Sequence, residues 1–277
     1  MSYDAQIKEI RNCAKSLLEQ GKVDLILGYG EGGFDGLSAP LFVRKPENCD
    51  KLIWGDRCWQ NLSGYLCGRS DKVGVVAKPC DVRGIVQLVI EGQIQRENVY
   101  IIGADCLKIV DSEGKLRPGC EDCTIHSPPI YDTYIQDERV QNLEPNQETT
   151  EEYSLERFQN EIDKCILCFA CRQACYGCYC NTCFMDRGVP NWLPGEVDSG
   201  AKMVFHLGKA MHLAGRCVEC GSCDAVCASG VHLRYIIKEV TRFVEETYDF
   251  KTGLDLDTKP AMMDFSPDDE DTGFLGR

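Results

Sequence analysis

The feature that most constrains this chain is a cysteine spacing that occurs twice in its second half. The spacing is CxxCxxCxxxC, and it stands first at Cys165, Cys168, Cys171 and Cys175 and again at Cys217, Cys220, Cys223 and Cys227. In two-cluster ferredoxins the first three cysteines of such a run bind one [4Fe–4S] cluster and the fourth binds the other. The spacing therefore predicts an α+β, ferredoxin-like domain that holds two [4Fe–4S] clusters and has a long insert between the runs.

The crossed pattern assigns four thiolates to each cluster. Three thiolates on one tight loop can cap three irons, so the fourth ligand must arrive from elsewhere to complete the cube. One cluster is expected on Cys165, Cys168, Cys171 and Cys227, and the other on Cys217, Cys220, Cys223 and Cys175. The alternative is a pair of zinc sites, which often take their four ligands as two separated pairs. A third CxxC step in both runs exceeds what zinc needs and favours the clusters.

The insert begins with three more cysteines at CxCxxC spacing, Cys178, Cys180 and Cys183. Neighbours at i and i+2 do not share a helix face, which suits a loop that wraps a metal. We expect these three to cap a further cluster whose fourth ligand comes from the first half. Free or zinc-bound thiols are the alternative.

The first half has the pattern of a small α/β domain with a parallel sheet. A helical apolar spacing covers residues 4–20, strand-like runs follow at 23–30 and 39–45, and a second helical spacing covers 56–68. A strand at 72–79, a helix at 81–93 and a strand at 98–104 then form a β-α-β unit, whose crossover implies parallel strands. Residues 128–135 are expected to return as an edge strand.

Four cysteines of this half fall where a parallel sheet gathers ligands. Cys80 and Cys106 follow the two strands of the β-α-β unit, and a CxxC pair, Cys120 and Cys123, comes after a polar turn. Ligands in open α/β sheets bind at the carboxyl ends of strands. The four thiols are predicted to hold a [4Fe–4S] cluster or a zinc ion. The alternative is burial as small apolar side chains.

Composition limits both organisation and function. Residues 1–140 are expected to form the α/β domain, 141–160 a polar linker, 161–250 the cluster domain and 251–277 an acidic tail. The net charge of −14 argues against nucleic-acid binding. The apolar runs are far shorter than the roughly 20 residues of a membrane span, and no leader pattern is found, so a cytoplasmic location without a membrane span is expected.

Other side chains near the runs have less specific roles. Arginines that can offset the charge of a cluster, or simply meet solvent, stand at Arg172, Arg187, Arg216 and Arg234. The histidines His206, His212 and His232 are expected to pack or cap helices.

The motifs of both halves resemble known protein families. VGVVAKPCDVRGI (73–85), ENVYIIGADC (97–106) and CEDCTIHSPPIYD (120–132) resemble the beta-subunit family of coenzyme F420 hydrogenases and formate dehydrogenases. CILCFACRQACYGCYCNTCF (165–184) and HLAGRCVECGSCDAVC (212–227) look like the dicluster ferredoxin modules that accompany those proteins and the heterodisulfide-reductase systems. The resemblance implies a first domain of that family fused to a dicluster ferredoxin module.

The resemblance implies electron relay in a multisubunit anaerobic oxidoreductase complex. Electrons would pass through two [4Fe–4S] clusters, with one or two more, between a catalytic subunit and a flavin-containing or heterodisulfide-reductase-like acceptor. The catalytic subunit would be a formate dehydrogenase, a hydrogenase or a similar enzyme. One alternative is a flavin-dependent reductase subunit that binds FAD and acts on F420 or another two-electron carrier. Another is a structural protein that uses metal as a staple.

Overall fold

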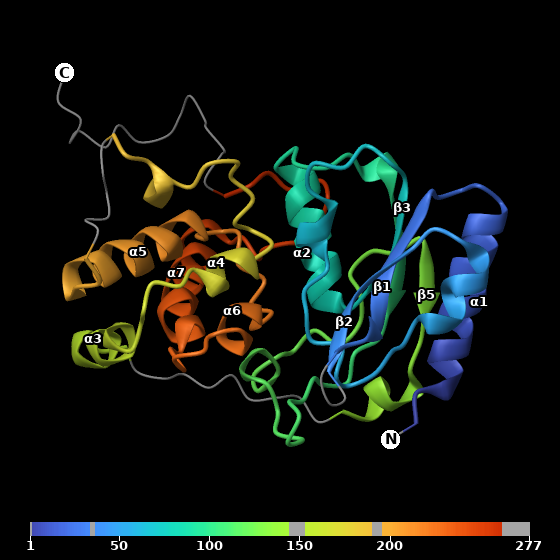
Figure 1. Cartoon of the computed structure of the whole chain (residues 1–277), viewed down its shortest axis with the longest axis horizontal. Helices are drawn as coiled ribbons and strands as arrows, with labels where there is room; N and C mark the ends of the chain where they lie inside the picture. The colour runs from blue at the N-terminus through green and yellow to red at the C-terminus, as the bar shows by residue number, and fades with distance from the viewer. Residues whose placement is uncertain (1, 34–36, 144–152, 190–195, 262–277) are drawn as a thin grey trace.

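A five-stranded sheet forms the centre of the first half of the chain (Figure 1). The computed structural model describes residues 2–33, 37–143, 153–189 and 196–261. The strands are β1 (Leu25–Glu31), β2 (Ser38–Val43), β3 (Val73–Ala77), β4 (Val99–Ala104) and β5 (Thr133–Ile135). Their order is β2-β1-β3-β4-β5, and every neighbouring pair is parallel except β1 with β2. The prediction of a mainly parallel sheet is confirmed.

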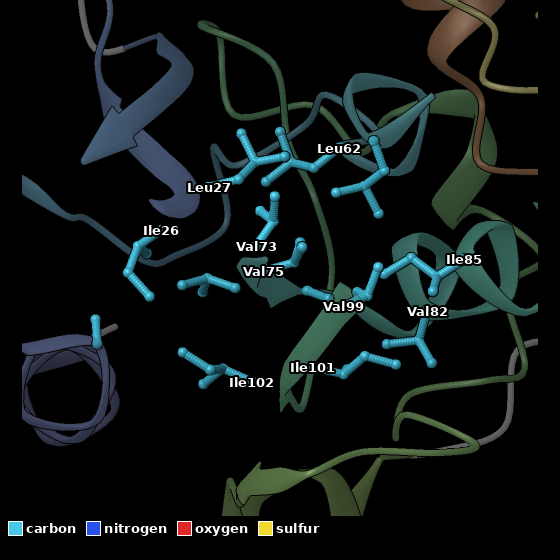
Figure 2. Packing of buried hydrophobic residues seen from close by; sticks show 14 of the residues in the cluster. Ile26, Leu27, Leu62, Val73, Val75, Val82, Ile85, Val99, Ile101 and Ile102 are labelled. Atoms are coloured by element: carbon cyan, nitrogen blue, oxygen red, sulfur yellow. The ribbon is translucent and has the colours of Figure 1, made fainter. Parts of the chain in front are cut away.

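Two helices cover opposite faces of this sheet. They are α1 (Asp4–Glu19) and α2 (Pro79–Ile90), and α2 lies between the sheet and the second half (Figure 1). Side chains alternate between the two faces along each strand. Ile26 and Ile102 point toward α1, whereas Val75 and Ile101 lie on the face covered by α2 (Figure 2). Residues of both faces belong to one apolar core. The strands are therefore buried on both sides, which explains their near-continuous apolar sequences.

The predicted helix over 56–68 is wrong, since that segment holds only a short 3₁₀ helix at Ser63–Leu66. Its own backbone hydrogen bonds, such as that from the N–H of Tyr65 to the carbonyl of Leu62, form only short turns, and other backbone groups bond to β1 and α2. The N–H of Leu62 donates to a carboxylate oxygen of Asp81 at 3.0 Å, and the carbonyl of Gln60 accepts from the hydroxyl of Tyr29 at 2.8 Å. Tertiary hydrogen bonds have replaced the helical ones.

The second half is a group of helices. They are α3 (Leu155–Asp163), α4 (Ala170–Gln173), α5 (Ser199–His212), α6 (Ser222–Ala225) and α7 (Leu233–Tyr248). Within residues 153–189 and 196–261 no strand is formed, so the β component expected of this half is wrong for its described part. The apolar faces of α3, α5 and α7 pack on one another and form the apolar core of this half without a sheet.

The predicted linker (141–160) and the predicted tail (251–277) both include residues that the structure places in packed elements. Part of the predicted linker, 144–152, lies outside the described residues, and its last residues belong to α3, which Ser154 caps by accepting from the N–H of Arg157. The start of the predicted tail is packed: Arg83 of α2 donates to the carbonyl of Thr252 at 2.9 Å. Residues 262–277 of the predicted tail lie outside the described residues.

The two halves are joined by polar contacts from α2 and from Glu91, the residue that caps its C-terminus. Glu91 accepts from Arg216 at 2.7 Å and from the hydroxyl of Tyr179 at 2.6 Å. Arg83 also donates to the carbonyl of Val218 at 3.3 Å. These contacts fix the cysteine-bearing loops of the second half against the sheet half.

Candidate iron–sulfur sites

The two cysteine runs fold into loops with the same backbone conformation. The N–H of Leu167 donates to Sγ of Cys165 at 3.3 Å, and at the equivalent place the N–H of Glu219 donates to Sγ of Cys217 at 3.4 Å. Leu167 and Glu219 both have positive φ, 51° and 57°. Such strained residues persist where the surroundings fix them, and they cluster at ligand-binding segments.

The match between the loops continues into the helices that follow. Phe169 (φ 61°) and Gly221 (φ 71°) are left-handed and directly precede α4 and α6. Each helix starts just before the third cysteine of its run, Cys171 or Cys223. The repeated spacing therefore produces a repeated local structure.

The first predicted set of four thiols shares one small cavity. Its wall includes Cys165, Cys168, Cys171 and Cys227. Burial raises the pKa of the Cys165 thiol, and the charges of Cys227 and Cys168 raise it further. Cys227 of the second run thus lies with the first three cysteines of the first run, as the crossed pattern requires. We call these four residues group 1.

The fourth cysteine of the first run lies with the second run. Burial raises the pKa of Cys217 to about 12, and Glu219, Cys220 and Cys175 add to the rise. Burial likewise raises the pKa of Cys223, to which Cys175 and Cys217 contribute. Cys217, Cys220, Cys223 and Cys175 are therefore neighbours, and we call them group 2.

Four cysteines of the sheet half converge at the carboxyl ends of β3 and β4. They line one cavity, whose volume is about 70 Å³, and are here called group 3: Cys80, Cys106, Cys120 and Cys123. Burial raises the pKa of Cys106, and the charges of Cys120 and Cys123 raise it further. Cys220 of group 2 lines the same cavity. Group 3 therefore adjoins group 2.

Cations surround the group 3 cavity in a chain whose net charge is −14. Its lining holds the cations Lys78, Arg83, Lys108, Arg117, Arg234 and Lys251, against the carboxylates Asp122 and Glu219. Two buried nitrogens there, Nη2 of Arg83 and Nε of Arg234, have no hydrogen-bond partner. Unsatisfied buried donors call for an acceptor, and a [4Fe–4S]²⁺ core on four thiolates carries two negative charges. The residues fit such a cluster.

The loop that carries Cys120 and Cys123 is held by α7. Arg234 donates to Asp122 at 2.8 Å and also to the carbonyl of Pro118, and Lys238 donates to Asp122 at 2.6 Å. Gly119 lies so close to the backbone of Cys220 that an added Cβ would come within 2.7 Å of it. This close approach brings group 3 against group 2.

A buried ion pair lies beneath group 3. Nζ of Lys78 is 2.9 Å from a carboxylate oxygen of Asp81, and both side chains are almost fully buried. The hydroxyl of Tyr29 also contacts both of them. Burial alone would lower the pKa of Lys78, but Asp81 and Cys80 outweigh it and raise that pKa. Lys78 therefore keeps a positive charge beside the thiols.

The three cysteines of the insert have different neighbours. Sγ of Cys178 lies 3.4 Å from Nζ of Lys209 and adjoins Cys175. Cys183 packs with group 1, and Cys180 is exposed. Their joint cluster stays a prediction.

In the part of the chain that the structure describes, no three His, Cys, Asp or Glu side chains are grouped to hold a single metal ion. In the same residues, no helix has the length and apolar character needed to cross a membrane.

Sequence patterns missed Lys78 and Arg83, at the start of and within α2, and Lys209 of α5, all of which lie near the thiols. The signal that could have identified Lys209 is a charged residue on an otherwise apolar face of α5. The same signal applies to Arg83, which lies among the buried residues of α2. Of the predicted arginines, Arg234 lines the group 3 cavity. Arg172 pairs instead with Asp186, and Arg216 with Glu91.

Comparison with known proteins identifies one relative that matches most of the chain and another that matches a third of it. A Methanocaldococcus jannaschii protein named F420-dependent formate dehydrogenase subunit beta is 23% identical over 352 aligned residues, which cover 90% of this chain and 92% of that protein. A Methanococcus maripaludis protein named F420-dependent formate dehydrogenase 1 subunit beta is 35% identical over 101 residues, or 33% of this chain and 24% of that protein. No family model matches the chain.

These matches confirm the predicted resemblance to the beta subunits of F420-dependent formate dehydrogenases. The fusion to a dicluster ferredoxin module stays a prediction. The aligned length in the first match exceeds the length of this chain, so that relative carries segments that this chain lacks.

Proposed function

We propose that this chain is an electron-transfer subunit that holds three [4Fe–4S] clusters in a row. Group 1 would hold the first, group 2 the second and group 3 the third. The observation that carries the proposal is the grouping itself: twelve thiols from both halves gather as three sets of four, and Cys220 of group 2 also lines the cavity of group 3.

Bound clusters of this type would each take up one electron and release it again, with no bond made or broken in the protein. The residues of the chain hold the thiols in place and balance their charge. The polar contacts of Glu91 and Arg83 across the two halves keep group 2 fixed relative to group 3. A fixed arrangement suits a wire inside a complex better than a mobile carrier.

The relatives suggest the partners. Both are named as beta subunits of F420-dependent formate dehydrogenases. We propose that a catalytic subunit of the formate dehydrogenase or hydrogenase type supplies the electrons, and that a flavin-containing or heterodisulfide-reductase-like subunit accepts them within a multisubunit anaerobic complex.

The test is reduction by a partner. The chain, purified without oxygen, is mixed with the catalytic subunit that copurifies with it, and the enzyme's substrate is added. We expect the visible cluster absorbance to bleach at a rate proportional to the amount of catalytic subunit, and to return once the substrate is exhausted and the acceptor subunit is added. Clusters that are bound but cannot be reduced, by the partner or by dithionite, would instead indicate a structural staple.

A second candidate function rests on another cavity, whose volume is about 470 Å³. It lies between the halves beside Cys175 and is lined by Trp59, Tyr65, Tyr176 and Tyr179 together with the amides of Gln60, Asn61 and Gln173. Aromatic walls and amides suit a flavin ring, which favours a reductase subunit that acts on F420 or another two-electron carrier. None of the described lining residues is charged, so the pyrophosphate of FAD has no cationic partner there. Flavin released on denaturation, together with F420 reduction, would support this candidate, and the absence of both would remove it.

A further inference from the structure

The four thiols of group 3 are held in place by two different parts of the molecule. Cys80 lies in the first turn of α2 and Cys106 follows β4, so the sheet half fixes both. Cys120 and Cys123 lie on the loop between β4 and β5, whose tip, residues 118–123, contacts the helical half. Two of the four proposed ligands therefore depend on contacts outside the sheet half.

The base of this loop is bonded within the sheet half. The N–H of Cys106 donates to the carbonyl of His126 at 2.9 Å, which closes the loop at its base. Further along, the guanidinium carbon of Arg117 lies 4.9 Å from the centre of the Trp59 ring. The sheet half thus fixes the loop as far as Arg117, directly before the tip.

Asp122 joins the tip of the loop to α7. It stands between Cys120 and Cys123, and its side chain is only 6% exposed. One of its carboxylate oxygens accepts from Arg234 at 2.8 Å, and the other accepts from Lys238 at 2.6 Å. Hydrogen bonds between ionised groups are stronger than neutral ones. Because both donors belong to α7, Asp122 ties the CxxC pair to that helix.

The start of α7 is placed by the segment that carries ligands of groups 1 and 2. The backbone N–H of Arg234 donates to Asp224 at 3.0 Å, and Asp224 directly follows Cys223 of group 2. Just before α7, the N–H of Val231 donates to Sγ of Cys227 of group 1 at 3.3 Å. The position of Arg234 against Asp122 therefore depends on how this segment is folded.

The dependence runs in one direction. All eight thiols of groups 1 and 2 come from residues 165–227, so neither group takes a ligand from the sheet half. The loop of group 3, by contrast, is bonded to α7. Bringing the ends of a flexible loop together costs entropy, and a metal site forms only where the fold collects its ligands. Loosening the helical half should therefore weaken group 3, whereas loss of group 3 should leave groups 1 and 2 in place.

We propose that Asp122 is a positioning residue that makes cluster binding at group 3 depend on the fold of the helical half. This inference rests on the proposed function, because it concerns how the third cluster is retained. Mutation of residues that orient metal ligands typically lowers metal affinity about 10- to 100-fold. We expect an effect of that size on group 3 and none on groups 1 and 2.

The experiment measures how fast the full chain, purified without oxygen, releases its iron. A chelator is added in excess, and native mass spectrometry counts the irons that remain on each chain with time. Asp122→Asn keeps the size of the side chain, removes its charge and turns an N–H donor toward α7. It should release about four irons about 10- to 100-fold faster than the wild type does.

Two single variants frame this result. Glu121→Gln removes an exposed carboxylate from the same CxxC pair, and its iron release should equal that of the wild type. Lys238→Met removes one of the two donors to Asp122 from the α7 side. Its release of iron should be faster than that of the wild type, but less so than in Asp122→Asn.

A double variant separates positioning from a general loss of stability. Cys106→Ser removes a ligand of group 3 and should leave the clusters of groups 1 and 2. Adding Asp122→Asn to Cys106→Ser should then leave the release of the remaining irons, about eight, unchanged. Faster release in the double variant would show that Asp122 stabilises the whole chain, and it would contradict a role specific to group 3.

Failure of the inference can be told from failure of the proposed function. If the wild type holds about twelve irons and Asp122→Asn releases them no faster than Glu121→Gln, the inference is wrong and the proposed function stands. If Asp122→Asn does not fold, Lys238→Met decides, and release at the wild-type rate would overturn the inference. A wild-type chain with about eight irons or fewer would contradict the third cluster and so the proposed function.

Discussion

The two halves of this molecule are held together by different means. The sheet half has one continuous apolar core that includes both faces of the sheet and the inner sides of α1 and α2. The helical half has three smaller clusters, and the thiols of groups 1 and 2 form part of their surface. Small cores seldom stabilise a domain unless metals or disulfides add to them. We therefore expect the sheet half to be stabilised by its apolar core, and the helical half to need the [4Fe–4S] clusters that we propose for groups 1 and 2.

The largest effect should come from removing iron. Chelation under reducing conditions is expected to unfold α3 to α7 and to leave the sheet intact, because metal binding free energy is folding free energy for domains of this kind. Amide hydrogen exchange checks this region by region. If the amides of residues 155–163 and 233–248 are equally protected from exchange with and without iron, the helical half does not depend on iron for its fold.

Next in size is loss of the buried cation beneath group 3. Lys78→Met leaves Asp81 charged and buried, which is expected to cost about 3–5 kcal/mol of unfolding free energy. Urea unfolding of the sheet half measures the loss. The double variant Lys78→Met with Asp81→Leu is the control and should recover much of it, since both charges are gone. A single variant within about 1 kcal/mol of the wild type would show that the pair is not essential to this core.

A smaller effect is expected where α7 holds the loop of Cys120 and Cys123. Asp122→Asn weakens bonds from Arg234 and Lys238 and should cost about 1.5–3 kcal/mol. Burial would raise the pKa of Asp122, but Lys238 and Arg234 outweigh it and lower that pKa below its ordinary 3.8.

The sign of the pH effect follows from that lowered pKa. The contribution of Asp122 is present above its unfolded pKa and is lost as the pH falls through the lower folded value. The wild type should therefore lose its advantage over Asp122→Asn below about pH 4. Unfolding free energies of the two proteins, measured from pH 6 to pH 3, check this, and a constant difference would refute it.

The smallest effect concerns a single hydrogen bond between the halves. Tyr179→Phe removes the donor to Glu91 and keeps the ring, so it should cost about 1 kcal/mol. Tyr65→Phe is a matched control because Tyr65 is 43% exposed. If Tyr65→Phe costs as much as Tyr179→Phe, the contact with Glu91 does not help to join the halves.

Local patterns predicted most elements, because apolar period and turn residues act over short distances. The β-α-β unit and α1 follow their predicted ranges closely, and the paired loops form as their spacing suggests. The helix over 56–68 was wrong because Asp81 and Tyr29 bind its backbone, and those contacts depend on tertiary packing.

Part of the candidate site could also be predicted. The repeated spacing with its crossed ligand pattern predicted groups 1 and 2, and the positions of Cys80 and Cys106 after two parallel strands, with a CxxC pair following, predicted group 3. These patterns did not indicate the neighbours Lys78 and Lys209, because their burial beside the thiols depends on how β3, α2 and α5 pack. They also did not show that Gly119 brings group 3 against Cys220.

The most direct test of the account is the iron content of the anaerobically purified chain, measured by native mass spectrometry. Three [4Fe–4S] clusters predict about twelve irons per chain, and Cys106→Ser is expected to reduce that to about eight while groups 1 and 2 remain. Fewer than about eight irons in the wild-type chain would contradict even the two clusters that the repeated cysteine runs predict.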